Sequence, residues 1–188
     1  MNTPAHIIFG AAAFAHPNKP KLTMAAIIGG LIPDLSLYLM VFWSYFVLGN
    51  NPDYIFNVQY FSLKWQSIFA IDNSFFVWAI ILYFSILIQK NWLKAFASSA
   101  FLHLSLDFLL HSQDARRQLW PLSDWVFISP LSYWDKNHYG HVIGGLEILI
   151  TLSLTIFLIS KFGRSKLSFL FMIIALLEIV PTFIFSSM

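Results

Sequence analysis

Long apolar runs alternate with short polar turns along almost the whole chain. The runs cover about residues 22–48, 73–89, 92–111, 139–160 and 167–187, and a shorter one covers 4–15. A helix rises about 1.5 Å per residue, so each long run can cross a hydrocarbon layer of roughly 30 Å. The short run can cross only part of that layer and is expected to be half-spanning or re-entrant. The pattern predicts an all-α fold, a polytopic membrane helix bundle of five spanning helices plus a short N-terminal half-helix.

The composition agrees with one integral membrane domain over residues 1–188. Hydrophobic residues make up 58% of the chain and charged residues 11%, with a mean hydropathy of +0.70. The net charge of +2 gives no reason to expect a nucleic-acid partner. The chain has no cysteine, which excludes disulfides, thiolate metal sites and a cysteine nucleophile. Any bound metal must therefore use His, Asp, Glu or water.

Basic residues predict the orientation of the bundle. Three turns carry lysine or arginine and no acid: Lys19 and Lys21, then Lys90 and Lys94, then Lys161, Arg164 and Lys166. The positive-inside rule places these turns in the cytoplasm and loops 50–72 and 112–138 on the opposite side of the membrane. The longer loop is rich in Trp, Pro, Ser and Asp and is expected to form a folded cap over a site. The stretch 50–72 is expected to supply a shorter, amphipathic part of that roof.

The strongest chemical signal is a group of ionisable residues inside one apolar run. His103, Asp107 and His111 have spacings of four and eight, which place them on neighbouring turns of one helix face. Ionisable side chains are costly inside a membrane and therefore mark a functional site by default. Imidazole and carboxylate groups are also ligands for divalent metals. The alternative is that His and Asp form a structural hydrogen-bonded pair that ties helices together.

Further ionisable residues share the same depth in the membrane. Counting about 1.5 Å per residue from the basic turns places His6, Asp34, His103, Asp107 and Glu147 at roughly 14–21 Å. The predicted metal ligands are His6, Asp34, His103, Asp107 and His111. Asp34 and Glu147 are the candidates for a catalytic proton acceptor.

Three residues near this layer have competing interpretations. Glu178 lies at a similar depth, but the neighbouring Pro181 offers a local explanation for it. Arg116 and Arg117 follow the His/Asp run at the outer interface. Either their side chains reach lipid headgroups, or one of them binds a substrate phosphate through two parallel hydrogen bonds.

Four short motifs resemble a known family. They are Thr-Pro-Ala-His (Thr3–His6), Leu-Ile-Pro-Asp-Leu-Ser (Leu31–Ser36), His-Leu-Ser-Leu-Asp (His103–Asp107) and Leu-Trp-Pro-Leu-Ser-Asp-Trp (Leu119–Trp125). They resemble bacterial inner-membrane proteins called membrane-bound metal-dependent hydrolases, a group related to zinc-dependent phospholipase C. The resemblance implies a zinc site at His6, Asp34, His103 and Asp107, with His111 close by. One family motif, His-Arg-Gly-x-Thr-His-Ser, is missing, because no histidine lies between His16 and His103.

Three functions fit these observations. The first is a membrane-embedded, metal-dependent hydrolase that cleaves a lipid-like phosphoester or acyl ester at the periplasmic leaflet, with zinc as cofactor and membrane lipid as substrate. The second is a non-catalytic subunit or scaffold, with a membrane-protein partner, whose His/Asp cluster is structural or only binds metal. The third is a transporter or proton relay, against which the lack of an inverted repeat counts.

Overall fold

The described part of the chain is entirely helical. A computed structural model describes residues 1–186, with side chains for residues 1–179, and contains no strand in that range. The α-helices are α1 (Thr3–Phe14), α2 (Pro20–Phe42), α3 (Pro52–Tyr54), α4 (Leu63–Asp72), α5 (Phe75–Leu87), α6 (Asn91–Leu110), α7 (Gly140–Phe162) and α8 (Lys166–Ser186). Wider π-helical turns follow α2 and α3, and one 3₁₀ turn covers Lys136–His138. The all-α prediction is therefore confirmed.

Four helical stretches are long and apolar enough to cross a membrane. They are Pro20–Val47, Leu63–Leu87, Asn91–Leu110 and Gly140–Phe162. This is the pattern of a multi-pass membrane protein. The fifth predicted span, 167–187, coincides with α8, but its last residue lies outside the described residues. The count of five spans therefore stays a prediction.

The structure on either side of Asn73 differs from the prediction for residues 63–72. Residues 63–72 were expected in the roof, but α4 continues into α5 as one candidate span, Leu63–Leu87. Trp65 and Phe69 are buried in a cluster that packs against the outer half of α2, and this burial holds α4 in the bundle. Ser74 begins α5 at once, because its hydroxyl accepts the backbone N–H groups of Phe76 and Val77. Both parts of 50–72 contact the cap: the Tyr60 hydroxyl donates to the Asp114 carbonyl oxygen over 3.1 Å, and the Phe69 ring centroid lies 4.8 Å from the guanidinium carbon of Arg116.

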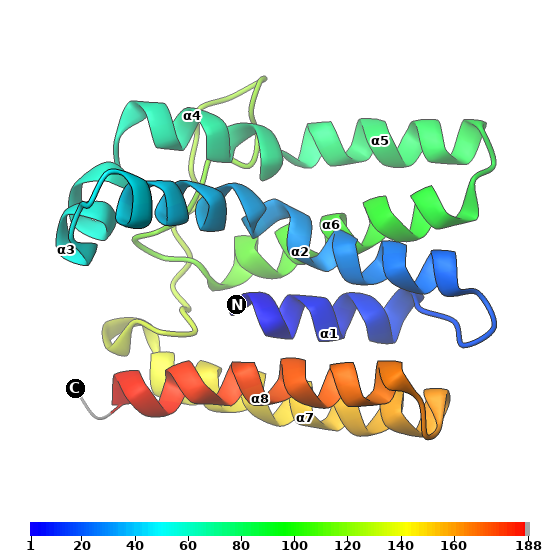
Figure 1. Cartoon of the computed structure of the whole chain (residues 1–188). Helices are drawn as coiled ribbons and strands as arrows, with labels where there is room; N and C mark the ends of the chain where they lie inside the picture. The colour runs from blue at the N-terminus through cyan, green and yellow to red at the C-terminus, as the bar shows by residue number, and fades with distance from the viewer. Residues whose placement is uncertain (187–188) are drawn as a thin grey trace.

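The three basic turns lie at one end of the bundle, as Figure 1 shows. Long helices extend away from that end, whereas α1 reaches only to near the middle of the bundle, where its N-terminus lies. The 12-residue α1 is too short to span a bilayer and contacts α2, α6, α7 and α8. The predicted half-helix is thus present, and its N-terminal residues open onto the centre of the bundle.

Gly30 lets α1 and α2 approach closely at this level. A Cβ at Gly30 would lie 2.7 Å from the His6 carbonyl oxygen and 3.0 Å from the Ile7 Cα. Such distances are well below van der Waals contact, so any larger residue would push the two helices apart. The sequence Gly29-Gly30-Leu31-Ile32-Pro33-Asp34 therefore places a carboxylate on α2 next to the start of α1.

Candidate metal centre

His103 has a fixed ring orientation. Its Nδ1 lies 2.8 Å from the carbonyl oxygen of Gly30, and because a carbonyl only accepts hydrogen bonds, Nδ1 must carry a proton. The other ring nitrogen, Nε2, lies 3.1 Å from Asp107 Oδ2 and 3.7 Å from Asp34 Oδ2. In a neutral imidazole this Nε2 would present its lone pair to two carboxylates, which is repulsive. A proton between these groups, on the ring or on a carboxyl group, or a bound cation is therefore required here.

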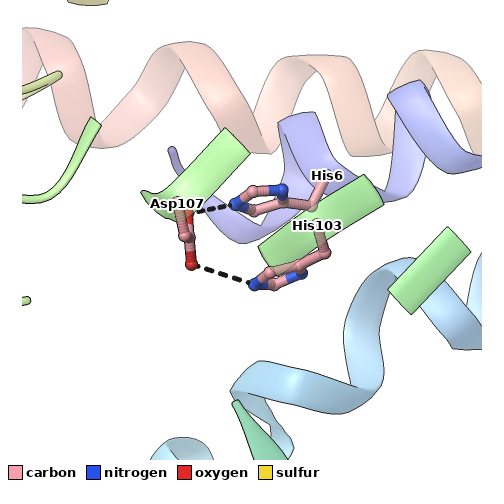
Figure 2. Close-up of side chains that lie close together, drawn as sticks. All are labelled: His6, His103 and Asp107. Atoms are coloured by element: carbon pink, nitrogen blue, oxygen red, sulfur yellow. Dashed lines mark hydrogen bonds and ion pairs between the residues drawn. The ribbon is translucent and has the colours of Figure 1, made fainter. Parts of the chain in front are cut away.

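His6 and Asp107 complete a group of three possible ligands. His6 Nε2 lies 2.8 Å from Asp107 Oδ1, and the two imidazole rings stack with centroids 3.5 Å apart. Figure 2 shows both rings presenting a nitrogen to the same carboxylate. One ligand atom from each residue lies within 4.8 Å of the other two, and all three residues are buried. Two imidazoles and a carboxylate are a ligand set that binds zinc and leaves a fourth position open.

Asp34 lies beside His6, His103 and Asp107, as predicted from its estimated depth in the membrane. Its Oδ2 accepts a hydrogen bond of 2.5 Å from the Thr3 hydroxyl, and Thr3 in turn accepts from the Tyr38 hydroxyl over 2.9 Å. Because Asp34 and Asp107 approach the same nitrogen of His103, their carboxylates lie on one side of the ring. The structure thus brings His6, Asp34, His103 and Asp107 together.

His111 joins the group from just beyond the helix. Helix α6 ends at Leu110 and His111 has an extended backbone, so the expected position on a helix face is wrong. The backbone N–H of His111 still bonds the carbonyl oxygen of Asp107, which keeps the two residues close. Its Nε2 lies 3.0 Å from Asp107 Oδ1 and its Nδ1 2.8 Å from Asp114 Oδ2. Burial opposes the charged ring, but the two carboxylates prevail and raise the pKa of His111.

The two arginines have different surroundings. Arg116 is buried, donates to Asn73 Oδ1 over 2.8 Å, and lies 3.4 Å from Asp34 Oδ1. Burial opposes its charge, but nearby Tyr60 and Asp34 prevail and raise the pKa of Arg116, so the guanidinium stays charged. Arg117 instead forms an exposed ion pair of 2.9 Å with Asp124 in the cap, and no described contact joins it to the cluster.

Glu147 is separated from the His/Asp group by the N-terminal residues. Its Oε1 accepts the backbone N–H of Asn2 over 2.7 Å. The adjacent amino nitrogen of Met1 lies 2.9 Å from Asp107 Oδ1. Glu147 therefore borders the centre without contacting His6 or His103 in any described interaction.

The charges of the buried layer do not balance. Asp34, Asp107, Glu147 and Glu178 are all buried, whereas the buried cations of this layer among the described residues are Arg116 and the Met1 amino group, which lies 2.9 Å from Asp107 Oδ1. Uncompensated carboxylates are very unfavourable in a low-dielectric interior. Histidine protonation, shared protons or a bound cation must therefore neutralise this layer. A divalent cation between His6, His103 and Asp107 would remove much of the imbalance.

A small cavity adjoins Asp107. It has a volume of about 10 Å³, which is room for about one water molecule. Its lining includes Asp107, His111 and Arg116, together with Phe108, Ala115, Gln118 and Phe127. Several of these residues belong to the loop 112–138, so the predicted cap does cover the centre.

Some residues of the site were not predicted from the sequence. Asn73 fixes Arg116 and also donates to the Pro33 carbonyl oxygen over 3.2 Å. A lone asparagine between two apolar helices was the available signal. Thr3 belonged to the Thr-Pro-Ala-His motif, yet no role was assigned to its hydroxyl. Asn2 carried no signal at all.

The comparisons with known proteins add no further constraint. No family model, no curated protein and no solved structure matches the chain. The fold and the site define a multi-span helical membrane protein with a buried His6/His103/Asp107 cluster that could hold a metal ion.

Proposed function

We propose that the protein is a membrane-embedded, metal-dependent hydrolase that acts on a lipid-like phosphoester or acyl ester at the periplasmic leaflet of the inner membrane. One observation carries the proposal. His103 donates from Nδ1 to a backbone carbonyl and presents Nε2 to two carboxylates, which is how metal-binding histidines are commonly oriented. The resemblance of four short motifs to those of membrane-bound metal-dependent hydrolases favours the same function.

The residues around the cluster have the properties that hydrolysis needs. When bound, a divalent ion such as zinc would supply Lewis acidity, which acidifies water and polarises a phosphoryl or acyl oxygen. His6, His103 and Asp107 would hold it, with Asp34 or His111 as a further ligand. Asp34 or Glu147 would accept a proton, because both carboxylates border the centre. Arg116 stays charged and lines the cavity beside Asp107, which suits binding of a phosphate oxygen.

The cavity also indicates how a substrate must enter. Space for one water molecule cannot admit a lipid headgroup, so substrate binding requires the cap, residues 112–138, to move away from α6. The outer end of α6 lies at headgroup depth in the predicted topology. A membrane lipid could then reach the centre from the side of the bundle.

The test is a paired measurement of metal content and hydrolysis. Protein purified in detergent without chelator should bind a divalent ion and hydrolyse at least one member of a panel of phospholipids and acyl esters. Asp107→Asn keeps the size of the side chain but removes a charged ligand, so metal content and hydrolysis should fall together. Parent protein that binds no metal and hydrolyses nothing in the panel would refute the proposal.

A non-catalytic membrane subunit is the second candidate, and one observation favours it. Each Asp107 oxygen already has a histidine neighbour, His6 at 2.8 Å and His103 at 3.1 Å. Protonated rings would satisfy that geometry without a metal. In this case Asp107→Asn would lower thermal stability, whereas the parent protein would bind no metal and show no hydrolysis.

A further inference from the structure

Two glutamates from different helices meet inside the bundle. Glu147 on α7 is 4% exposed and Glu178 on α8 is 1% exposed. Their carboxyl groups lie close enough to influence each other, and Asn2 contacts one oxygen of each. An ionised carboxylate can only accept hydrogen bonds, so one carboxyl group can bond the other only when one of them carries a proton.

Asn2 bridges the two acids. Its backbone N–H donates to Glu147 Oε1 over 2.7 Å, and its side-chain Nδ2 donates to Glu178 Oε1 over 3.0 Å. Asn2 occupies the N-cap position of α1, where an asparagine side chain usually accepts a backbone N–H of its own helix. Here it makes no such capping bond. The side chain instead links α1 to α8, while the backbone links it to α7.

The surroundings of the pair contain little positive charge. The nearby charged or titratable groups are the Met1 amino group, which Asp107 also contacts, and Tyr133. Thr151, one turn after Glu147 on α7, is fully buried and its hydroxyl has no partner. Two ionised carboxylates at this depth would repel each other in a medium of low dielectric constant. A single proton shared by the two carboxyl groups removes this repulsion and lets one carboxyl group donate a hydrogen bond to the other.

We propose that Glu147 and Glu178 form a proton-binding site, in which the two carboxyl groups share one proton at neutral pH and together clamp Asn2. The clamp fixes the first turn of α1. Thr3 follows Asn2 and bonds Asp34, and His6 lies one turn further along the helix. The glutamate pair is therefore a positioning device that holds His6 next to Asp107 and His103.

Infrared spectroscopy tests the shared proton directly. At neutral pH the parent protein should show the C=O stretching band of a protonated carboxylic acid. The double variant Glu147→Gln with Glu178→Gln should lose this band, whereas Asp53→Asn, at an exposed position, should keep it. A parent without the band, as expected if a metal cation neutralised the pair, or a double variant that retains it would overturn the proposal.

Metal affinity tests the clamp, and this second measurement rests on the proposed metal centre. Glu178→Gln keeps an acceptor for Asn2 and should bind zinc within about twofold of the parent. Glu178→Ala removes the acceptor and should weaken zinc binding by about tenfold, the usual scale for residues that orient metal ligands. If Glu178→Ala does not fold, Asn2→Ala removes the same bond from the other side. Equal affinity in the Gln and Ala variants would overturn the clamp. The infrared result is independent of any metal, so failure of the metal centre would leave it unaffected.

Discussion

Replacing Gly30 by alanine should disrupt the metal centre without touching a ligand side chain. The added Cβ would lie 2.7 Å from the His6 carbonyl oxygen, whereas comfortable contact needs about 3.5 Å. Helices α1 and α2 would therefore have to separate by about 0.8 Å. Metal–ligand distances tolerate only about 0.2 Å, so His6 would leave the ligand set. The same movement would strain the 2.8 Å hydrogen bond from His103 to the Gly30 carbonyl oxygen.

The expected cost can be measured against a matched control. Overpacking at Gly30 should lower the free energy of unfolding by about 1–3 kcal/mol, and zinc affinity should fall by at least tenfold. Gly145→Ala is the control, because a Cβ there meets nothing within 4 Å. Thermal unfolding in detergent and competition titration with a zinc chelator report the two quantities. A Gly30→Ala protein with the zinc affinity of Gly145→Ala would refute the argument.

The remaining predictions concern charge and topology. Arg116→Ala should leave bound metal unchanged and weaken substrate binding, seen as a raised KM, because its guanidinium lines the cavity without belonging to the ligand set. Arg117→Ala breaks only an exposed ion pair, so bound metal and KM should both stay within about twofold of the parent values. Equal effects of Arg116→Ala and Arg117→Ala would contradict the role of Arg116 in substrate binding. In intact cells a membrane-impermeant thiol reagent should label Ser123→Cys in the cap and not Ser165→Cys in a basic turn. The reverse labelling would overturn the orientation.

The sequence predicted the metal centre best where two of its residues lie on the same helix. His103 and Asp107 are four residues apart on α6, so the period of the helix alone brings them together. Asp34 and His6 were placed by depth, which works because membrane helices are nearly parallel and the basic turns mark a common starting level. His111 was placed correctly in space but not in the helix, since α6 ends one residue earlier.

Contacts that depend on tertiary packing could not be predicted in this way. Asn73 lies at a break between two apolar helices, and only the packing of α4 against α2 turns its side chain toward Arg116. For the same reason residues 63–72 were misassigned to the roof. Their own pattern is weakly amphipathic, and burial against a neighbouring helix decides their place. Asn2 contacts α7 and α8 at a sequence distance of more than 140 residues, which no local pattern records.

Metal analysis of the purified protein tests the central claim most directly. The parent chain, prepared in detergent without chelator and supplied with zinc, should retain about one divalent ion per chain, as expected for a His₂–carboxylate site. His103→Ala should retain none, because it removes the nitrogen that faces both Asp34 and Asp107. A parent protein that retains no more metal than His103→Ala would contradict the metal centre and would assign the cluster to protonated histidines instead.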